Sequence, residues 1–298
     1  MDRTKFIGAS EIAAVLGLSK WDTPLGVWAE KTGKVPAKDL SANESVEWGT
    51  RLERVVSSKF AEKHKVKLMA YKKRYVHPEY PFLSCELDNI IVGTDTLVEV
   101  KTCHEYVGKD WGEDDIPIEY VYQVMMQLGL SGRKKGWIAV LIGGNKYRER
   151  EIAFDQEMYD GMVEKAVHFW NAFVLADVQP IAVGGDGDIL LQLYPGEVTD
   201  DLVEGGEEED EWVAFLQETK MHIAEMTKEK KDVEAKIKQK IADALGMVTD
   251  KYKVTYKQTT TRRVDTDKIK AEGLFDQYSK ESSSRRMNVK LNKITEGA

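Results

Sequence analysis

The segment from residue 82 to residue 102 constrains the fold most, because it has the pattern of two short strands joined by a tight turn. Alternating apolar residues lead to Asp88, and residues 92–95 are of the types that turns favour. Successive side chains of a strand point to opposite faces, so Glu99 and Lys101 share one face of the second strand. We therefore predict a β-hairpin with a carboxylate and an ammonium side by side and a second carboxylate, Asp88, on the neighbouring strand.

These residue types fit a divalent-metal nuclease site. Mg²⁺ binds through one or two carboxylates, water and substrate phosphate oxygens, which Asp88 and Glu99 would complement. The Val100 carbonyl is a further candidate ligand, and Lys101 would hold an attacking water or lower its pKa. The alternative is an exposed hairpin with solvated charges, since alternating charge is common on edge strands. The hairpin motif alone is weak, so the rest of the chain has to support it.

Composition describes a soluble, cytoplasmic protein. The chain has 298 residues, of which 42% are hydrophobic and 32% charged. No apolar run approaches the ~20 residues that span a membrane, and the N-terminus lacks a signal-peptide pattern. Cys85 and Cys103 have no zinc or iron–sulfur spacing, and we expect free thiols.

The net charge of −8 is unevenly distributed. Residues 212–298 hold 19 Lys and Arg against 13 Asp and Glu, a net +6, so residues 1–211 carry −14. A basic extension is compatible with phosphate contacts, and carboxylates gathered for metal binding add to the acidic part. Net charge therefore does not exclude a DNA substrate.

The N-terminal segment predicts a helix that begins at Ser10, a good N-cap, and stops at Gly17. Free backbone N–H groups at such a helix start bind phosphate, and Arg3 could add charge-assisted bonds to the same anion. The alternative is an ordinary capped helix. A second helix is expected from Pro24 to about Thr32.

The middle of the chain predicts an α+β fold, with a central mixed sheet flanked by helices. Val46, Leu52, Val55, Val56 and Phe60 give the 42–65 helix an apolar face, with Glu53 among them. The 117–131 helix carries Gln123 and Gln127 on one face. The other expected elements are strands at 67–77, 137–143 and 147–154 and a helix at 155–176.

The C-terminal part changes character. We expect a core at 1–183, an acidic, Gly-rich connector at 184–210 and an extension at 211–298. The extension should hold a long helix at 211–245, which packs on the core or on another subunit, and a helix capped by Asp265. It should also hold a hairpin of 251–257 with 261–264 and a strand at 284–290. Basic residues mark this end: Arg262, Arg263, Arg285 and Arg286.

Taken together, five motifs resemble the YqaJ-type phage recombination exonucleases, typified by the phage lambda exonuclease, a branch of the PD-(D/E)XK nucleases. The resemblance covers residues 3–175. The motifs are IGASEIAAVLGLSKWDTPLGVWAEKTG, Glu47-Trp48-Gly49 with Glu53, LSCELDNI, LVEVKT and YVYQVMMQLGLSG.

The resemblance implies a PD-(D/E)XK restriction-endonuclease-like core and the roles of its residues. Asp88 and Glu99 would bind Mg²⁺ or Mn²⁺, Lys101 would activate the water, and Glu53 would be the helix-borne acid. Gln123 is preferred to Gln127 as the catalytic glutamine, although the usual Gln-Val-Gln reads Gln-Val-Met here, which leaves the choice open. Arg3 and Ser10 match the positions that hold the 5′-phosphate of a DNA end.

The function implied is a double-strand DNA exonuclease that resects 5′→3′ and leaves 3′ single-stranded tails for phage-type recombination. Relatives form a ring-shaped trimer around DNA and act beside a single-strand annealing protein. A structure-specific or restriction-like endonuclease would use the same core without needing a free end. A non-catalytic DNA-end or protein-binding module is the third alternative. A related nuclease with an iron–sulfur cluster is disfavoured, because two cysteines cannot supply a four-cysteine cluster.

Overall fold

The computed structural model describes residues 2–37, 42–112, 115–196, 202–280, 287 and 289. The chain divides into two compact units, Met1–Val198 and Thr199–Ala298. In the described part, no helix is both long and apolar enough to cross a bilayer.

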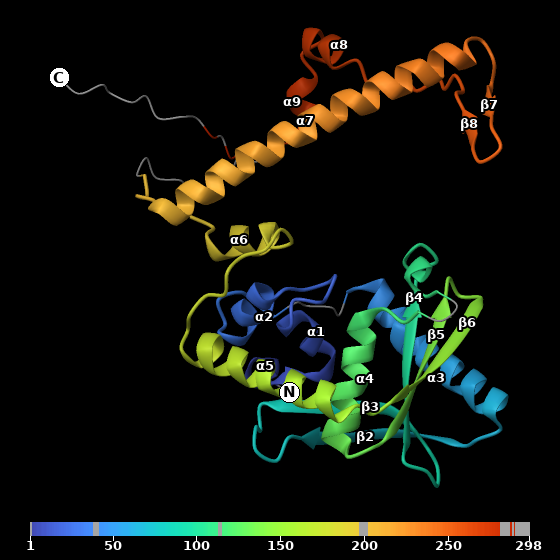
Figure 1. Ribbon diagram of the computed structural model, residues 1–298, viewed down its shortest axis with the longest axis vertical. Helices are drawn as coiled ribbons and strands as arrows, with labels where there is room; N and C mark the ends of the chain where they lie inside the picture. The colour runs from blue at the N-terminus through green and yellow to red at the C-terminus, as the bar shows by residue number, and fades with distance from the viewer. Residues whose placement is uncertain are drawn as a thin grey trace. The chain divides into compact units, whose positions relative to one another are not determined.

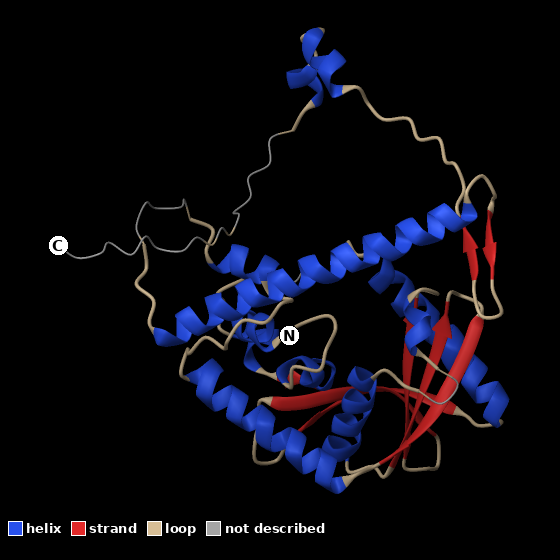
Figure 2. Ribbon diagram, turned by 45° about the horizontal axis from the view of Figure 1, so that its top comes forward, coloured by secondary structure: helices blue, strands red, loops and turns tan. Residues whose placement is uncertain are grey.

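A six-stranded mixed sheet forms the centre of the first unit (Figures 1 and 2). Its order is β1-β3-β4-β5-β6, and β2 also pairs with β3. The β1–β3 and β4–β5 pairs are parallel and the others are antiparallel. The strands are β1 (Ile7–Gly8), β2 (Leu68–Val76), β3 (Leu83–Ile91), β4 (Thr96–Cys103), β5 (Lys135–Ile142) and β6 (Lys146–Ala153).

Helices cover both faces of the sheet, which confirms the predicted α+β class (Figure 2). On one face, Val56 and Phe60 of α3 (Glu44–His64) pack against Val98 of β4. Leu97, the preceding residue, belongs to the core of the opposite face. That second core is formed with α1 (Ile12–Val15), α2 (Pro24–Lys31), α4 (Ile118–Ser131) and α5 (Gln156–Phe169).

The apolar face expected along α3 is only partly buried. Val56 and Phe60 lie in the core, whereas Val46 and Val55 are exposed. The N-terminal half of the helix contacts the sheet near Gly49, where an added Cβ would lie 3.4 Å from Oγ1 of Thr102. The exposed valines lie elsewhere on the helix surface, so the apolar face predicted there was too wide.

The N-terminal segment does not use Ser10 as a helix cap, and this expectation was wrong. A 3₁₀ turn spans Ala9–Glu11, and its N-cap is Gly8. The Glu11 carboxylate accepts a hydrogen bond from Gly8 N at 2.7 Å, as in a capping box. The Glu11 side chain therefore starts the helix two residues earlier than a cap at Ser10 would. Two further 3₁₀ turns lie at Arg3–Lys5 and Val107–Asp110, and a π turn at Trp170–Leu175 follows α5.

The segment expected as an exposed connector contains a helix, α6 (Gly187–Leu193). Asp186 before it is fully buried. Its carboxylate accepts hydrogen bonds from the Thr23 hydroxyl and, at 2.6 Å, from Val183 N. Because one carboxylate ties the segment to the start of α2, residues next to α6 pack on the first unit.

The second unit contains α7 (Glu207–Ile241), β7 (Gly246–Val248), β8 (Lys253–Thr255), α8 (Thr266–Ala271) and α9 (Phe275–Tyr278). The small hairpin pairs β7 with β8, so the expected pairing of 251–257 with 261–264 was wrong. Asp265 caps α8 as predicted, since its Oδ1 accepts from Lys268 N at 3.0 Å. Arg285 and Arg286 lie outside the described residues, as does most of the strand expected at 284–290.

Candidate active site

The site begins where β3 and β4 separate. The two strands pair at Asn89↔Val98 and Ile90↔Leu97 and no further along β4. Beyond that point Oδ2 of Asp88 accepts a hydrogen bond from Val100 N at 2.9 Å, in place of a backbone carbonyl. The N–H and C=O of one strand residue face the same neighbour, so the Val100 carbonyl also faces the gap. The hairpin therefore gathers one carboxylate and one carbonyl oxygen at the separation.

Glu99 is buried, with 3% of its surface exposed, on the sheet face that α4 covers. Oε1 accepts from Gln123 Nε2 at 2.5 Å, and Oε2 accepts from Gln127 Nε2 at 2.7 Å. Both glutamines therefore donate a hydrogen bond to the Glu99 carboxylate. A helical spacing of four residues places the two amides one above the other along β4.

Lys101 completes the cluster. Its Nζ lies 2.7 Å from Oε1 of Glu99 and 5.5 Å from the centre of the Tyr120 ring. Burial opposes the charged form, but the Glu99 carboxylate outweighs it and raises the pKa of the Lys101 ammonium. Lys101 is therefore a cation near neutral pH, a donor and not a general base.

Asp88 titrates differently from an ordinary aspartate. Burial is the main cause and the charge of Glu99 the second, and together they raise its pKa to about 7. The charge of Glu53, on α3, acts in the same direction, which places this third carboxylate in the electrostatic neighbourhood. Two buried carboxylates close together repel each other, so they are stabilised when one of them takes up a proton or when a cation binds.

The donor set suits a hard cation. Carboxylates of Asp88 and Glu99 with the Val100 carbonyl are the oxygen ligands that Mg²⁺ takes in small number, completing its shell with water and phosphate. Within the described ranges no three His, Cys, Asp or Glu side chains are grouped closely enough to hold a metal. By their chemistry, the Asp88 and Glu99 carboxylates and the Val100 carbonyl fit such a cation.

A cleft of about 320 Å³ joins this cluster to the N-terminal segment. Lys101 and Gln123 line it together with Arg3 and Ser10. A neighbouring cleft of about 260 Å³ shares Arg3, Ser10 and Gln123 and adds Gln127. Residues about 90 positions apart in the sequence therefore border one space. The structure brings all the predicted site residues except Glu53 to the hairpin or its clefts.

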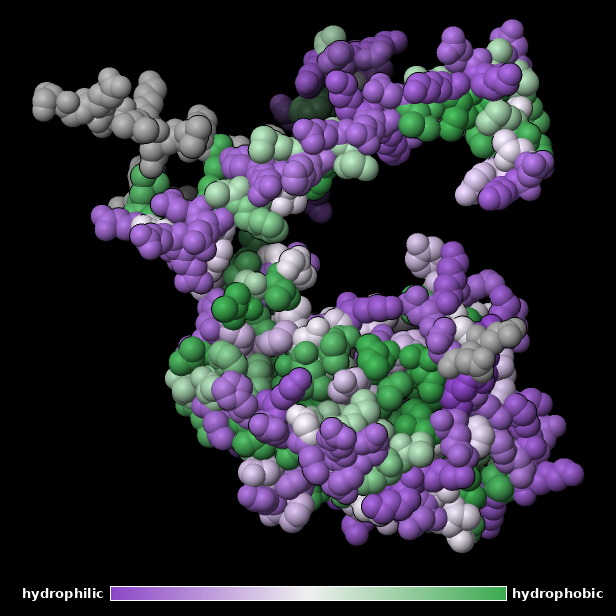
Figure 3. Space-filling view, in the orientation of Figure 1, coloured by the Kyte–Doolittle hydropathy of each residue, from purple (hydrophilic) through white to green (hydrophobic). Residues whose placement is uncertain are grey.

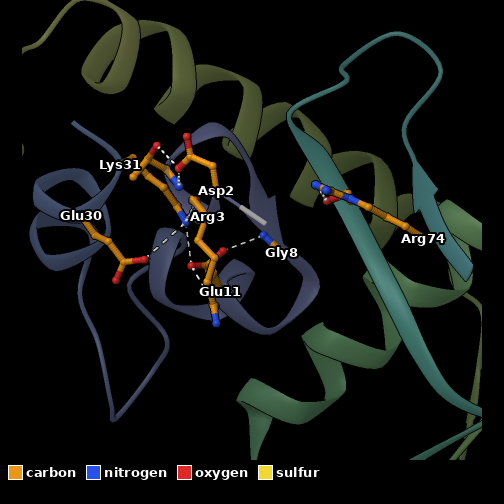
Figure 4. A network of polar contacts seen from close by, with 9 residues as sticks. Asp2, Arg3, Gly8, Glu11, Glu30, Lys31 and Arg74 are labelled. Carbon is orange, nitrogen blue, oxygen red and sulfur yellow. Dashed lines mark hydrogen bonds and ion pairs between the residues drawn. The ribbon is translucent and has the colours of Figure 1, made fainter. Parts of the chain in front are cut away.

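Arg3 is held by a buried network (Figure 4). Lys31 on α2, whose side chain is fully buried, donates to the Arg3 carbonyl at 2.8 Å and to Oε1 of Glu11 at 2.7 Å. The Arg3 guanidinium lies 3.4 Å from the same Glu11 oxygen, and its side chain is exposed. The network fixes the backbone of Arg3 and leaves its charged end accessible.

Several residues of the site were missed by sequence reasoning. Lys31 and Glu11 look like ordinary helix-surface charges, and only the fold shows that they meet. Tyr120 and Trp21 line the larger cleft, and Trp21 is exposed. For Tyr120 there was a signal: it lies three residues before Gln123, on the same face of α4.

Residues 1–134 match the model of the YqaJ-like viral recombinase domain. The Bacillus subtilis (strain 168) "Uncharacterized protein YqaJ" is 32% identical over 299 residues, covering 97% of this chain and 92% of that protein.

Two exonucleases are among the solved structures that resemble this chain. An alkaline exonuclease from Laribacter hongkongensis has a TM-score of 0.49 and 16% identity, covering 59% of this chain and 91% of that chain. A phage-related exonuclease from Haemophilus somnus 129PT has a TM-score of 0.49 and 13% identity, covering 58% and 95%.

Proposed function

The chain belongs to the family of YqaJ-like viral recombinase domains, and from this premise we propose that it is a metal-dependent double-strand DNA exonuclease. The observation that carries the proposal is the shared cleft, in which Lys101 and Gln123 of the carboxylate cluster face the same space as Arg3 and Ser10. An end-binding element beside a hydrolytic site is what an enzyme that starts at DNA ends requires.

Each residue has a defined task in this proposal. Asp88, Glu99 and the Val100 carbonyl hold Mg²⁺ or Mn²⁺, and Glu53 adds negative charge nearby. When bound, such an ion supplies Lewis-acid polarisation of the scissile phosphate. The Lys101 ammonium donates to the attacking water and stabilises negative charge as the phosphorus–oxygen bond breaks. Gln123 and Gln127 keep the Glu99 carboxylate in place.

Arg3 and Ser10 would bind the 5′-phosphate of the end. The Arg3 guanidinium supplies charge-assisted hydrogen bonds, and the exposed Ser10 hydroxyl supplies one more donor. Binding the 5′ end orients resection 5′→3′ and leaves a 3′ single strand. We further propose a homotrimer around the duplex and a single-strand annealing protein as the recipient of the product, in the cytoplasm of a bacterial or phage-infected cell.

One gel assay tests the proposal. Purified protein with Mg²⁺ is incubated with linear duplex labelled at the 5′ or the 3′ end, beside a covalently closed circle. We expect early release of the 5′ label, persistence of the 3′ label in single strands and an intact circle. Cutting of the circle would instead favour an endonuclease, and no cleavage in any metal would favour a non-catalytic end-binding module.

A further inference from the structure

The long helix α7 carries an apolar stripe with alternating spacings of four and three residues. The stripe consists of Trp212, Leu216, Ile223, Met226, Val233 and Ile237, and the polar residues Thr219 and Lys230 occupy the two remaining stripe positions. Four of these apolar side chains, Trp212, Ile223, Met226 and Val233, are each more than half exposed. Figure 1 shows α7 as one uninterrupted helix, and Figure 3 shows apolar residues among its charged ones. A spacing that averages 3.5 residues is the seam of a coiled coil.

The charges of α7 are strongly asymmetric along its length. The first turn is acidic, with Glu207, Glu208, Glu209 and Asp210, and the last turn carries Lys238 and Lys240. Two parallel copies would place acidic turn against acidic turn and Lys230 against Lys230 in the seam. Two antiparallel copies place the acidic turn of each against the basic turn of the other. Like charges close together destabilise a pair and opposite charges stabilise it, so the antiparallel arrangement is favoured.

We propose that two copies of this chain associate through α7 as an antiparallel helix pair. The two-fold axis passes between Ile223 and Met226, so that Ile223 packs against Met226 of the partner subunit. The same register places Leu216 against Val233 of the partner subunit and Trp212 against Ile237 of the partner subunit. Every apolar residue of the stripe then meets another.

The two polar positions fall into the same register. Thr219 lies opposite Lys230 of the partner subunit, and the lysine stem covers apolar surface while its ammonium reaches water. The stripe from Trp212 to Ile237 covers more than three heptads, the length at which a heptad pattern indicates a coiled coil. This interface is separate from the proposed ring of the first unit, and each can fail without the other.

The test compares two methionines of the same helix. Met226 lies in the stripe and Met221 lies five residues before it, off the stripe, and the two are 63% and 60% exposed. The molar mass of the full chain is measured by light scattering and sedimentation over a range of concentrations. We expect Met226→Glu to raise the dissociation constant of the α7 pair on the order of 100-fold and Met221→Glu to leave it at the wild-type value.

The comparison remains valid if the first unit also oligomerises, because both variants retain that unit. Circular dichroism checks that each variant keeps its helix content. Equal masses for wild type, Met226→Glu and Met221→Glu would overturn the proposal.

Crosslinking tests the direction of the pair. The double variant Leu216→Cys/Val233→Cys should form a disulfide-linked dimer under mild oxidation, whereas each single variant should give no more dimer than the wild type with its native thiols. Within one helix these two positions are about 25 Å apart, too far for a disulfide. A dimer from each single variant would show parallel helices and overturn the antiparallel assignment.

Discussion

Gln127 donates from Nε2 to Oε2 of Glu99 at 2.7 Å and to the Glu86 carbonyl at 3.1 Å, and so joins α4 to both strands of the hairpin. Gln127 is 2% exposed, and its own Oε1 is buried without a hydrogen-bond partner. One amide group thus holds the Glu99 carboxylate and the strand that leads to Asp88. The arrangement allows the site to be tested through groups that do not touch a metal.

Replacing Gln127 should therefore cost stability as well as activity. Gln127→Met keeps the side-chain length but removes the Nε2 group that donates to the Glu86 carbonyl and to Oε2 of Glu99. Leaving buried polar groups unsatisfied costs ~1–3 kcal/mol, and we expect the free energy of unfolding in urea to fall by that amount. Gln156→Met, at an exposed position of α5, is the matched control and should be neutral. Equal stability of the two variants would contradict the bridging role.

Lys101→Ala should lower the rate of hydrolysis by ~10²–10⁴-fold, the effect of removing one proton-donating group from a transition state. Metal affinity should stay within a few-fold, whereas Glu99→Gln should weaken it, because of these two residues only Glu99 is a proposed metal ligand. Lys135→Ala, an exposed lysine on β5, controls for loss of charge. Calorimetry with Mg²⁺ and single-turnover kinetics separate the effects. Wild-type cleavage by Lys101→Ala, once a contaminating nuclease is ruled out, would contradict the proposed role of the lysine.

Arg3→Ala should reduce the preference for a 5′-phosphate over a 5′-hydroxyl end. A hydrogen bond to a charged group contributes ~1.5–3 kcal/mol, so the ratio of the two rates should fall by about ten- to a hundred-fold. Lys5→Ala removes an exposed charge two residues away that does not line either cleft, and it should retain the preference. If the wild type degrades both ends equally fast, the end-binding assignment of Arg3 and Ser10 fails.

The raised pKa of Asp88 predicts how metal-free stability depends on pH. In the folded protein the pKa of Asp88 is about 7, against an ordinary pKa of 3.8. Between these two pH values the folded protein therefore binds more protons than the unfolded chain. The stability that the Asp88 proton gives the folded state is therefore fully present below pH 3.8 and is lost as pH rises to 7. In EDTA, Asp88→Asn should gain melting temperature relative to the wild type between pH 5 and pH 8. Addition of Mg²⁺ at pH 8 should restore the melting temperature of the wild type and leave that of the variant unchanged. A difference independent of pH would rule out this titration.

Local patterns were sufficient to predict the centre of the molecule. The hairpin from Leu83 to Cys103 and the helix carrying Gln123 and Gln127 appear as expected, because alternation in a strand and a four-residue repeat in a helix are both local signals. Local sequence signals could not decide between the two glutamines. It depends on how α4 lies over β4, and in the structure both amides contact Glu99.

Errors arose where tertiary contacts override local preference. Ser10 is a good cap by residue type, but the Glu11 carboxylate takes the Gly8 N–H because buried Lys31 holds it nearby. Residues next to Asp186 seemed a solvated connector, yet burying that one carboxylate against Thr23 fastens the segment. The small hairpin of the second unit depends on three-residue strands, which are too short for a pattern of alternation.

The separation of β3 from β4 has a spectroscopic consequence. Val100 N–H is a backbone amide whose acceptor is the titrating Asp88 carboxylate. Its ¹H and ¹⁵N resonances, and its rate of exchange with deuterium, should follow the charge on that oxygen. A single amide signal in uniformly labelled protein would then report whether the carboxylate carries a proton, is free or is engaged by a cation, without any probe attached to the protein.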